Sequence, residues 1–125
     1  MLNVCSNCGI YRADKTIDPS GPSAICPACG HRHNFLYLPL WVVSGASGSG
    51  KSTVCNHLTG QYKHVVLLDS DIIWRETFDT SETKYRDFFE TWLRICKNIA
   101  QSGGPVVLFG AGAGVPENLD RKSVV

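Results

Sequence analysis

Apolar residues gather into three short continuous runs in the last two thirds of the chain. Runs of this length, rich in valine, leucine and phenylalanine, are typical of strands that are buried on both faces. The three predicted strands cover residues 40–43, 64–69 and 105–109. One short helix and one long helix with helically spaced apolar residues are predicted between them, so the pattern alternates strand and helix. This alternation predicts an α/β fold, with a parallel sheet in a three-layer arrangement.

A long helix is predicted over residues 82–102, where apolar side chains recur three and four positions apart. The residues of this apolar stripe are Tyr85, Phe88, Phe89, Trp92, Ile95, Cys96 and Ile99. Thr80 or Ser81 is the expected N-cap, and Gly103 is expected to end the helix. A shorter helix is predicted over residues 51–59. We expect the aromatic side chains of the long helix to form the core against the sheet.

The loop after the first predicted strand has the sequence of a phosphate-binding loop. Glycines let successive backbone N–H groups face a polyphosphate, and the N-terminus of the next helix favours the same negative charge. We expect Lys51 to contact the β- and γ-phosphates and the Ser52 hydroxyl to bind Mg²⁺. A flexible glycine and serine linker is the alternative. The G-x-x-x-x-G-K-[ST] pattern and the next residue are the predicted nucleotide contacts: Gly45, Ala46, Ser47, Gly48, Ser49, Gly50, Lys51, Ser52 and Thr53.

Two acidic residues and a glycine-rich turn are predicted at the carboxyl edge of the sheet. Asp69 ends the second predicted strand and Asp71 follows it, while Gly110 and Gly112 follow the third strand. Ligands of open α/β sheets bind at this edge, so these residues should lie beside the phosphate-binding loop. One carboxylate can serve water bound to Mg²⁺ and the other an acceptor hydroxyl. Alternatively, Asp71 caps a short turn and the glycines form only a flexible connection.

Four of the six cysteines lie in the first 29 residues, in the pairs Cys5-x-x-Cys8 and Cys26-x-x-Cys29. A tight turn across each pair aims two thiolates at one point, and two such turns supply the four sulfur ligands of a structural zinc ion. The alternatives are two disulfides, which need an oxidising compartment, or a redox-active pair, which needs a βαβ context. The spacing resembles that of zinc ribbons. We therefore predict a zinc ribbon at residues 1–38, whose folding depends on the metal.

The order of the later motifs resembles P-loop small-molecule kinases, the group that includes shikimate, gluconate and nucleoside kinases. The resemblance covers about residues 39–115 and rests on the phosphate-binding loop, Asp69-Ser70-Asp71, Tyr85-Arg86 and Gly110-Ala111-Gly112. It implies that Asp69 helps to hold Mg²⁺ and that Asp71 contacts or deprotonates the acceptor hydroxyl. It also implies that Arg86 binds the substrate and that Gly110 and Gly112 line its pocket.

The length of 125 residues leaves a kinase-like domain at 39–125 after the zinc ribbon. The kinases that it resembles continue with an arginine-bearing lid and further strands. We therefore expect a truncated domain with an incomplete sheet, whose open edge is covered by a partner or by a second copy of the chain.

Composition and charge exclude several classes of protein. The net charge of +1 offers no basic surface, so nucleic acid is not an expected partner. Apolar runs fall far short of the roughly 20 residues of a membrane span, and the N-terminus lacks the apolar region of a signal peptide. We expect a cytoplasmic protein that binds no membrane.

Together these observations predict an ATP-binding, kinase-like protein with Mg²⁺ and a structural Zn²⁺. It would transfer a phosphoryl group to a hydroxyl of a small molecule such as a nucleoside, with Lys51 and Asp71 as catalytic residues. The alternative is a non-catalytic regulator or adaptor that binds ATP or GTP and whose zinc ribbon binds a partner.

Overall fold

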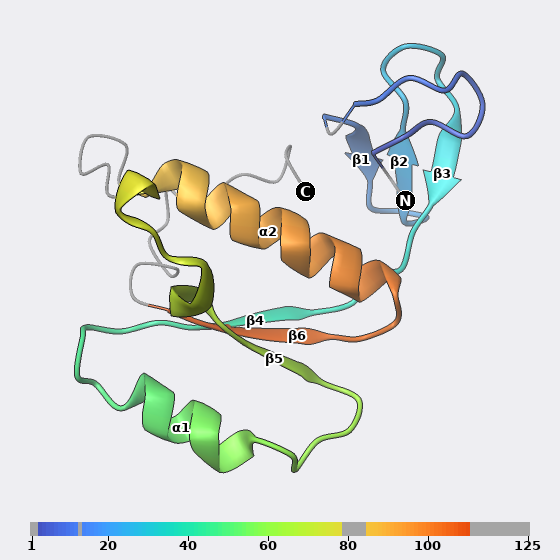
Figure 1. Cartoon of the computed structure of the whole chain (residues 1–125). Helices are drawn as coiled ribbons and strands as arrows, with labels where there is room; N and C mark the ends of the chain where they lie inside the picture. The colour runs from blue at the N-terminus through green and yellow to red at the C-terminus, as the bar shows by residue number, and fades with distance from the viewer. Residues whose placement is uncertain (1–2, 13, 79–84, 111–125) are drawn as a thin grey trace.

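Two separate β-sheets organise the chain (Figure 1). The computed structural model describes residues 3–12, 14–78 and 85–110. The N-terminal sheet is antiparallel and contains β1 (Thr16–Asp18), β2 (Ser23–Ile25) and β3 (Arg32–Asn34). The second sheet is parallel and contains β4 (Leu40–Val43), β5 (Val66–Asp69) and β6 (Val106–Phe109). We call residues 3–12 and 14–34 the cysteine module, and residues 40–78 and 85–110 the parallel-sheet region.

The last strand in the sequence lies at the centre of the parallel sheet, because β6 pairs with β4 on one side and β5 on the other. Phe109 of β6 is in register with Val43 of β4 and with Asp69 of β5. All three strands therefore end at the same edge of the sheet. The loops that follow β4 and β5 both begin at this edge, as the sequence predicted for the phosphate-binding loop and the acidic residues.

Helices lie on both faces of the parallel sheet, with α1 (Lys51–Leu58) on one side and α2 (Arg86–Gln101) on the other (Figure 1). Two short 3₁₀ helices, Ser70–Ile73 and Glu76–Phe78, follow β5. The α/β fold with a parallel sheet is thereby confirmed. The strand predicted at 40–43 matches β4, and the strand predicted at 64–69 is shorter, because pairing with β6 begins at Val66.

The start of α2 differs from the prediction. The helix begins at Arg86, and its N-cap residue is Tyr85 rather than Thr80 or Ser81, which lie outside the described residues. Tyr85 has a left-handed backbone with φ of 60°, and its side chain makes no capping hydrogen bond. It is also 39% exposed, so its assignment to the buried stripe was wrong. The left-handed residue breaks the helical geometry, and the stripe begins only at Phe88.

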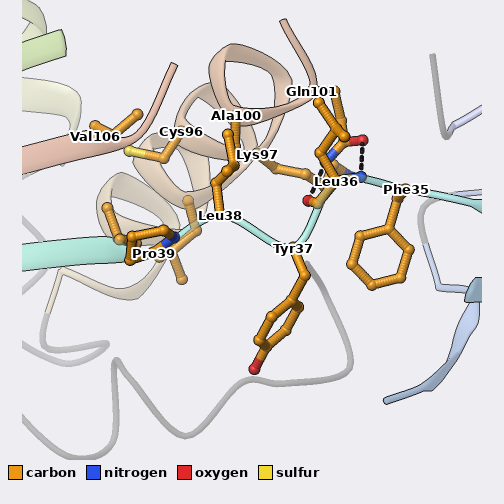
Figure 2. A pocket seen from close by; sticks show the side chains of 12 residues that line it. Phe35, Leu36, Tyr37, Leu38, Pro39, Cys96, Lys97, Ala100, Gln101 and Val106 are labelled. Carbon is orange, nitrogen blue, oxygen red and sulfur yellow. Dashed lines mark hydrogen bonds between the residues drawn. The ribbon is translucent and has the colours of Figure 1, made fainter. Parts of the chain in front are cut away.

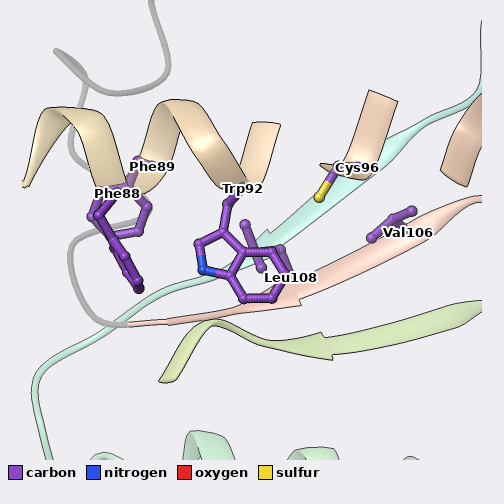
Figure 3. Packing of buried hydrophobic residues seen from close by; sticks show 6 residues of the cluster. All are labelled: Phe88, Phe89, Trp92, Cys96, Val106 and Leu108. Carbon is purple, nitrogen blue, oxygen red and sulfur yellow. The ribbon is translucent and has the colours of Figure 1, made fainter. Parts of the chain in front are cut away.

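The hydrophobic core lies between α2 and the central strand β6 (Figure 3). Ile95 and Ile99 are partly buried at its margin. By contrast, α1 has no buried residue. The predicted core role of the α2 stripe is therefore confirmed from its second member onward. The buried residues of this cluster are Phe88, Phe89, Trp92, Cys96, Val106 and Leu108.

The C-terminal half of α2 also holds the cysteine module and the segment that follows it. The Gln101 amide donates to the Leu36 carbonyl at 3.0 Å and accepts from the Leu36 N–H at 2.9 Å (Figure 2). Lys97 donates to Oδ1 of Asn3 at 2.9 Å, and burial lowers the pKa of this ammonium group. An apolar cavity of about 140 Å³ lies between residues 35–40 and α2.

Candidate functional site

The phosphate-binding loop connects β4 to α1 in a conformation that depends on glycine. Gly50 is the N-cap residue of α1 and has a left-handed backbone with φ of 91°. At Gly45, φ is 153°, and a Cβ atom would lie only 2.8 Å from the Ser49 hydroxyl oxygen. Side chains at these two positions would therefore strain the loop or open it. The first N–H groups of α1 have no partner within the helix and point out of its N-terminus, as an anion requires.

Lys51 bends back over its own loop. Its Nζ donates to the carbonyl oxygens of Gly45 at 2.8 Å and Ala46 at 2.7 Å, and to the Ser49 hydroxyl at 3.3 Å. The loop therefore already surrounds one positive charge. A phosphate oxygen would compete for this ammonium group with three neutral oxygens, and its bond would be the stronger one because both donor and acceptor are charged.

A cavity of about 290 Å³ opens at this loop and joins it to the turn after β5. Lys51, Ser52 and Asp71 supply an ammonium group, a hydroxyl and a carboxylate to one space. Of the predicted contacts, Gly45, Ala46 and Ser49 do not line the cavity, and the first two instead present carbonyl oxygens to Lys51. The cavity is lined by Ser47, Gly48, Gly50, Lys51, Ser52, Thr53 and Asp71.

The two acidic residues have different positions. Asp69 is the N-cap of the first 3₁₀ helix, and its Oδ1 accepts the backbone N–H of Asp71 at 3.0 Å. The expected alternative gave the capping role to Asp71, and the structure gives it to Asp69 instead. Asp71 lines the cavity, whereas Asp69 does not. The cap therefore holds the backbone of the acidic residue that lines the cavity.

The remaining residues implied by the kinase resemblance lie apart from this cavity. Arg86 is exposed in the first turn of α2, and it does not line the cavity. Gly110 is buried, and its N–H donates to the Val43 carbonyl at 3.1 Å, which extends the pairing of β6 with β4. Gly112 lies outside the described residues. The structure thus brings together Lys51, Ser52 and Asp71, and it leaves Arg86 and Gly110 outside.

The four N-terminal cysteines form a second candidate site. Their sulfur atoms all lie within 4.8 Å of one another, and the closest pairs are Cys5–Cys29 at 3.6 Å and Cys8–Cys26 at 3.9 Å. None of the four forms a disulfide in the structure, because these separations are far longer than the roughly 2.05 Å of a sulfur–sulfur bond. A tetrahedron of zinc–sulfur bonds about 2.3 Å long has sulfur–sulfur edges of about 3.8 Å. The cluster therefore has the dimensions of a four-sulfur metal site.

Two turns of the same design position these sulfurs. In each turn the N–H of the first cysteine donates to the carbonyl five residues later at 2.9 Å, and the glycine N–H donates back to that cysteine at 2.8 Å. Both glycines, Gly9 and Gly30, have φ of 73°, which a side chain rarely adopts. The first cysteine of each pair is buried and the second is exposed.

The thiols of the cluster differ in the pKa that their surroundings give them. The backbone N–H of Cys8 donates toward the Cys5 sulfur and lowers the pKa of that thiol to about 5. The Asn7 side chain, 3.6 Å from the Cys29 sulfur, lowers the pKa of Cys29. The Ile10 amide lowers the pKa of Cys8, but desolvation and the neighbouring sulfurs outweigh it and raise that pKa to about 11. A divalent cation bound by the four sulfurs would take the place of the protons that they share.

Sequence reasoning missed two contacts that fix these sites. The indole Nε1 of Trp92 donates to the Ser70 carbonyl at 3.1 Å, inside the protein and beside Asp71. Lys97, a buried cation on α2, holds Asn3 of the cysteine module. Helical periodicity indicated that Trp92 is buried but not where its N–H points. No pattern along the chain pairs residues 3 and 97.

Comparison with known proteins identifies the family of the parallel-sheet region. A family profile described as AAA domain matches residues 40–118, more than half of the chain. A comparison with curated proteins and another with solved structures found no match. In the part of the chain that the structure describes, no helix is long and apolar enough to cross a membrane. The matched segment contains β4, the phosphate-binding loop and the Asp71 turn, and the chain therefore belongs to the AAA domain family of P-loop proteins.

Proposed function

We propose that the protein is a Mg²⁺-dependent kinase that transfers the γ-phosphoryl group of ATP to a hydroxyl of a small molecule. The observation that carries this proposal is the shared cavity, because Lys51, Ser52 and Asp71 all line it. Nucleotide binding alone needs the loop and Lys51. A carboxylate in the same cavity is what the transfer step requires, because the acceptor hydroxyl must be oriented and must lose a proton.

The roles of the side chains follow from their positions. Lys51 would exchange its loop carbonyls for the β- and γ-phosphates and stabilise the charge that develops during transfer. The Ser52 hydroxyl would bind Mg²⁺ in the cavity. Asp69 lies outside the cavity and would act by holding the backbone of Asp71. When bound, Mg²⁺ would neutralise phosphate charge. Asp71 would accept a hydrogen bond from the acceptor hydroxyl and hold it in line with the phosphoryl group.

We propose further that the cysteine cluster binds a structural zinc ion, as in a zinc ribbon. Four sulfurs at these separations complete a tetrahedral shell and leave no position for a reactive water. The role of the metal is therefore to fold the module.

Phosphorylated product is the direct test. The purified chain, with Zn²⁺ bound, is incubated with Mg²⁺, ATP labelled on the γ-phosphate, and panels of nucleosides and of small hydroxy acids. We expect one class to accept the label, and we expect Asp71→Asn to lose transfer while it keeps ATP binding. The matched control is Asp87→Asn, an exposed acid in the first turn of α2. Transfer by Asp71→Asn at the wild-type rate would remove Asp71 from the mechanism.

A regulator that binds ATP or GTP without transferring phosphate is the second candidate. The observation that favours it is the attachment of the cysteine module to α2 through Asn3 and Lys97, which joins a partner-binding type of module to the nucleotide region. Tight nucleotide binding without labelled product from any acceptor would favour this candidate over the kinase.

A further inference from the structure

The turn that carries Asp71 is fixed from outside by a residue of α2. The peptide group between Ser70 and Asp71 is hydrogen-bonded at both ends. Its carbonyl accepts the indole N–H of Trp92 at 3.1 Å, and its N–H donates to Oδ1 of Asp69 at 3.0 Å. The Asp71 carbonyl in turn accepts the N–H of Trp74 at 3.1 Å. The peptide planes on both sides of the Asp71 Cα atom are therefore held.

The Trp92 bond is the long-range member of this set. The bonds from Asp69 and Trp74 act within the turn, so they can hold its shape but not its place relative to the sheet. Trp92 and Ser70 are each only 1% exposed, and water does not compete for their bond. Figure 3 shows the Trp92 ring reaching from α2 onto the sheet, within the hydrophobic core. Packing in the core thus fixes the position of the ring. The hydrogen bond from its N–H then fixes the Ser70 carbonyl, and with it the turn, relative to α2.

We propose that Trp92 is a positioning residue for the nucleotide site, acting through the Ser70 carbonyl to hold the Asp71 carboxylate in the cavity with Lys51 and Ser52. The proposal rests on the proposed function, because it assigns Trp92 a role toward the Mg²⁺ and ATP bound there. The core requires only the apolar ring at this position. The N–H group is the part that the site requires, and phenylalanine would supply the ring without it.

A readout that follows the Asp71 charge distinguishes positioning from packing. A carboxylate in the cavity repels ATP alone and attracts the cation of Mg²⁺-bound ATP. The ratio of ATP dissociation constants without and with Mg²⁺ therefore reports whether the carboxylate is in place. Loss of stability leaves this ratio unchanged, provided that the protein is folded at the temperature of the measurement.

The experiment measures this ratio by calorimetry for wild type, Trp92→Phe, Asp71→Asn and the double variant. We expect Trp92→Phe to lower the ratio by about threefold to tenfold, and to cause no further loss when Asp71→Asn is present, because coupled residues are not additive. Phe89→Leu is the matched control, since Phe89 is a buried aromatic residue of the same helix. It should lower stability and leave the ratio within about twofold of wild type.

Two outcomes would overturn the inference. One is a wild-type ratio in Trp92→Phe, and the other is an equal loss with and without Asp71→Asn. If wild type shows no Mg²⁺-dependent binding of ATP, the proposed function fails and this inference fails with it. If wild type shows that dependence and Trp92→Phe keeps it, the inference alone fails.

The indole signals of the wild-type protein give an answer even if Trp92→Phe does not fold. The chain has three tryptophans, and Trp41 and Trp74 are each 48% exposed. Trp41→Phe and Trp74→Phe assign the signals in ¹⁵N spectra. We expect the Trp92 N–H to exchange with solvent far more slowly than the other two and to shift when Mg²⁺ and ATP are added. Exchange as fast as that of Trp41 would show that the bond to Ser70 is absent and would overturn the inference.

Discussion

The cysteine module and the parallel-sheet region build their sites by opposite means. In the module, the backbone contacts that shape each cysteine turn are local, since each turn closes through two backbone hydrogen bonds within six residues. In the parallel-sheet region, the cavity joins the loop after β4 to the turn after β5, and a residue of α2 holds that turn. The module carries its geometry in its sequence spacing, whereas the other site exists only when the sheet and helix have assembled.

The source of stability differs in the same way. The buried hydrophobic residues of the module are Cys5, Ala24 and Cys26, and two of these are cluster cysteines. The core cluster lies entirely in α2 and β6. Little apolar area is therefore available to the module, and a bound metal would have to supply most of its folding free energy. The parallel-sheet region depends instead on packing. Loss of metal should therefore unfold the module, and loss of core packing should destabilise the parallel-sheet region.

Loss of the metal site is the largest effect that we expect. Cys26→Ser removes one of four ligands, and structural zinc contributes about 10–16 kcal/mol in small zinc-binding peptides. The variant should bind no stoichiometric zinc and should lose the dispersed NMR signals of β1–β3, while signals of α2 and β6 remain. Cys55→Ser, a cysteine of α1 outside the cluster, is the control and should retain the metal. A folded module in zinc-free Cys26→Ser would show that metal does not stabilise it.

A cavity in the core should produce the converse result. Leu108 of β6 is 2% exposed and packs in the α2 cluster. Replacement by alanine should lower the free energy of unfolding by about 2–5 kcal/mol, as measured by urea denaturation. Zinc content should stay at one per chain. Val54→Ala, on the exposed face of α1, is the control and should change stability little. Loss of zinc from Leu108→Ala would mean that the module cannot fold without the core.

The third prediction concerns nucleotide affinity, which should change without any change in core packing or zinc binding. Lys51→Ala removes a charge-assisted contact to phosphate that is worth about 1.5–3 kcal/mol, so ATP should bind about 10- to 150-fold more weakly. The fold and the zinc content should not change. Lys63→Ala, an exposed lysine beyond α1, is the control. Binding of Mg²⁺ and ATP by Lys51→Ala at wild-type affinity would contradict the role of the loop.

The contrast between local and long-range contacts also explains what could be predicted from sequence. The cysteine cluster depends on spacing within each turn, and β4 depends on a continuous apolar run before the glycine-rich loop. Both were predicted with the right residues. The start of α2 was not, because the left-handed backbone of Tyr85 fixes where the helix begins and no side chain caps it. N-cap sequence patterns detect only those helix starts at which a side chain forms the capping hydrogen bond.

The candidate site shows the same limit. The glycines and Lys51 follow one motif, and strand order placed Asp71 at the correct edge of the sheet. The division of roles between Asp69 and Asp71 depends on which carboxylate turns toward its own backbone, and the two positions look equivalent in the sequence. Trp92 and Lys97 are further examples, since their polar atoms meet partners 22 and 94 residues away.

The smallest effect that we expect concerns the junction between the two regions. It tests whether the two regions unfold independently. Gln101 forms two hydrogen bonds with the backbone of Leu36, and Leu36 is half exposed. Because such bonds contribute about 1 kcal/mol each, Gln101→Ala should lower stability by about 2 kcal/mol. Asn98→Ala is the control, since Asn98 is exposed on the same helix and bonds only within it. Hydrogen exchange should show which residues lose stability.

If the regions are independent, exchange in Gln101→Ala should rise in the cysteine module and in residues 35–39 and stay constant in β6. A rise of equal size in β6 would show that the two regions unfold together, and the module would then be part of the stability of the nucleotide site.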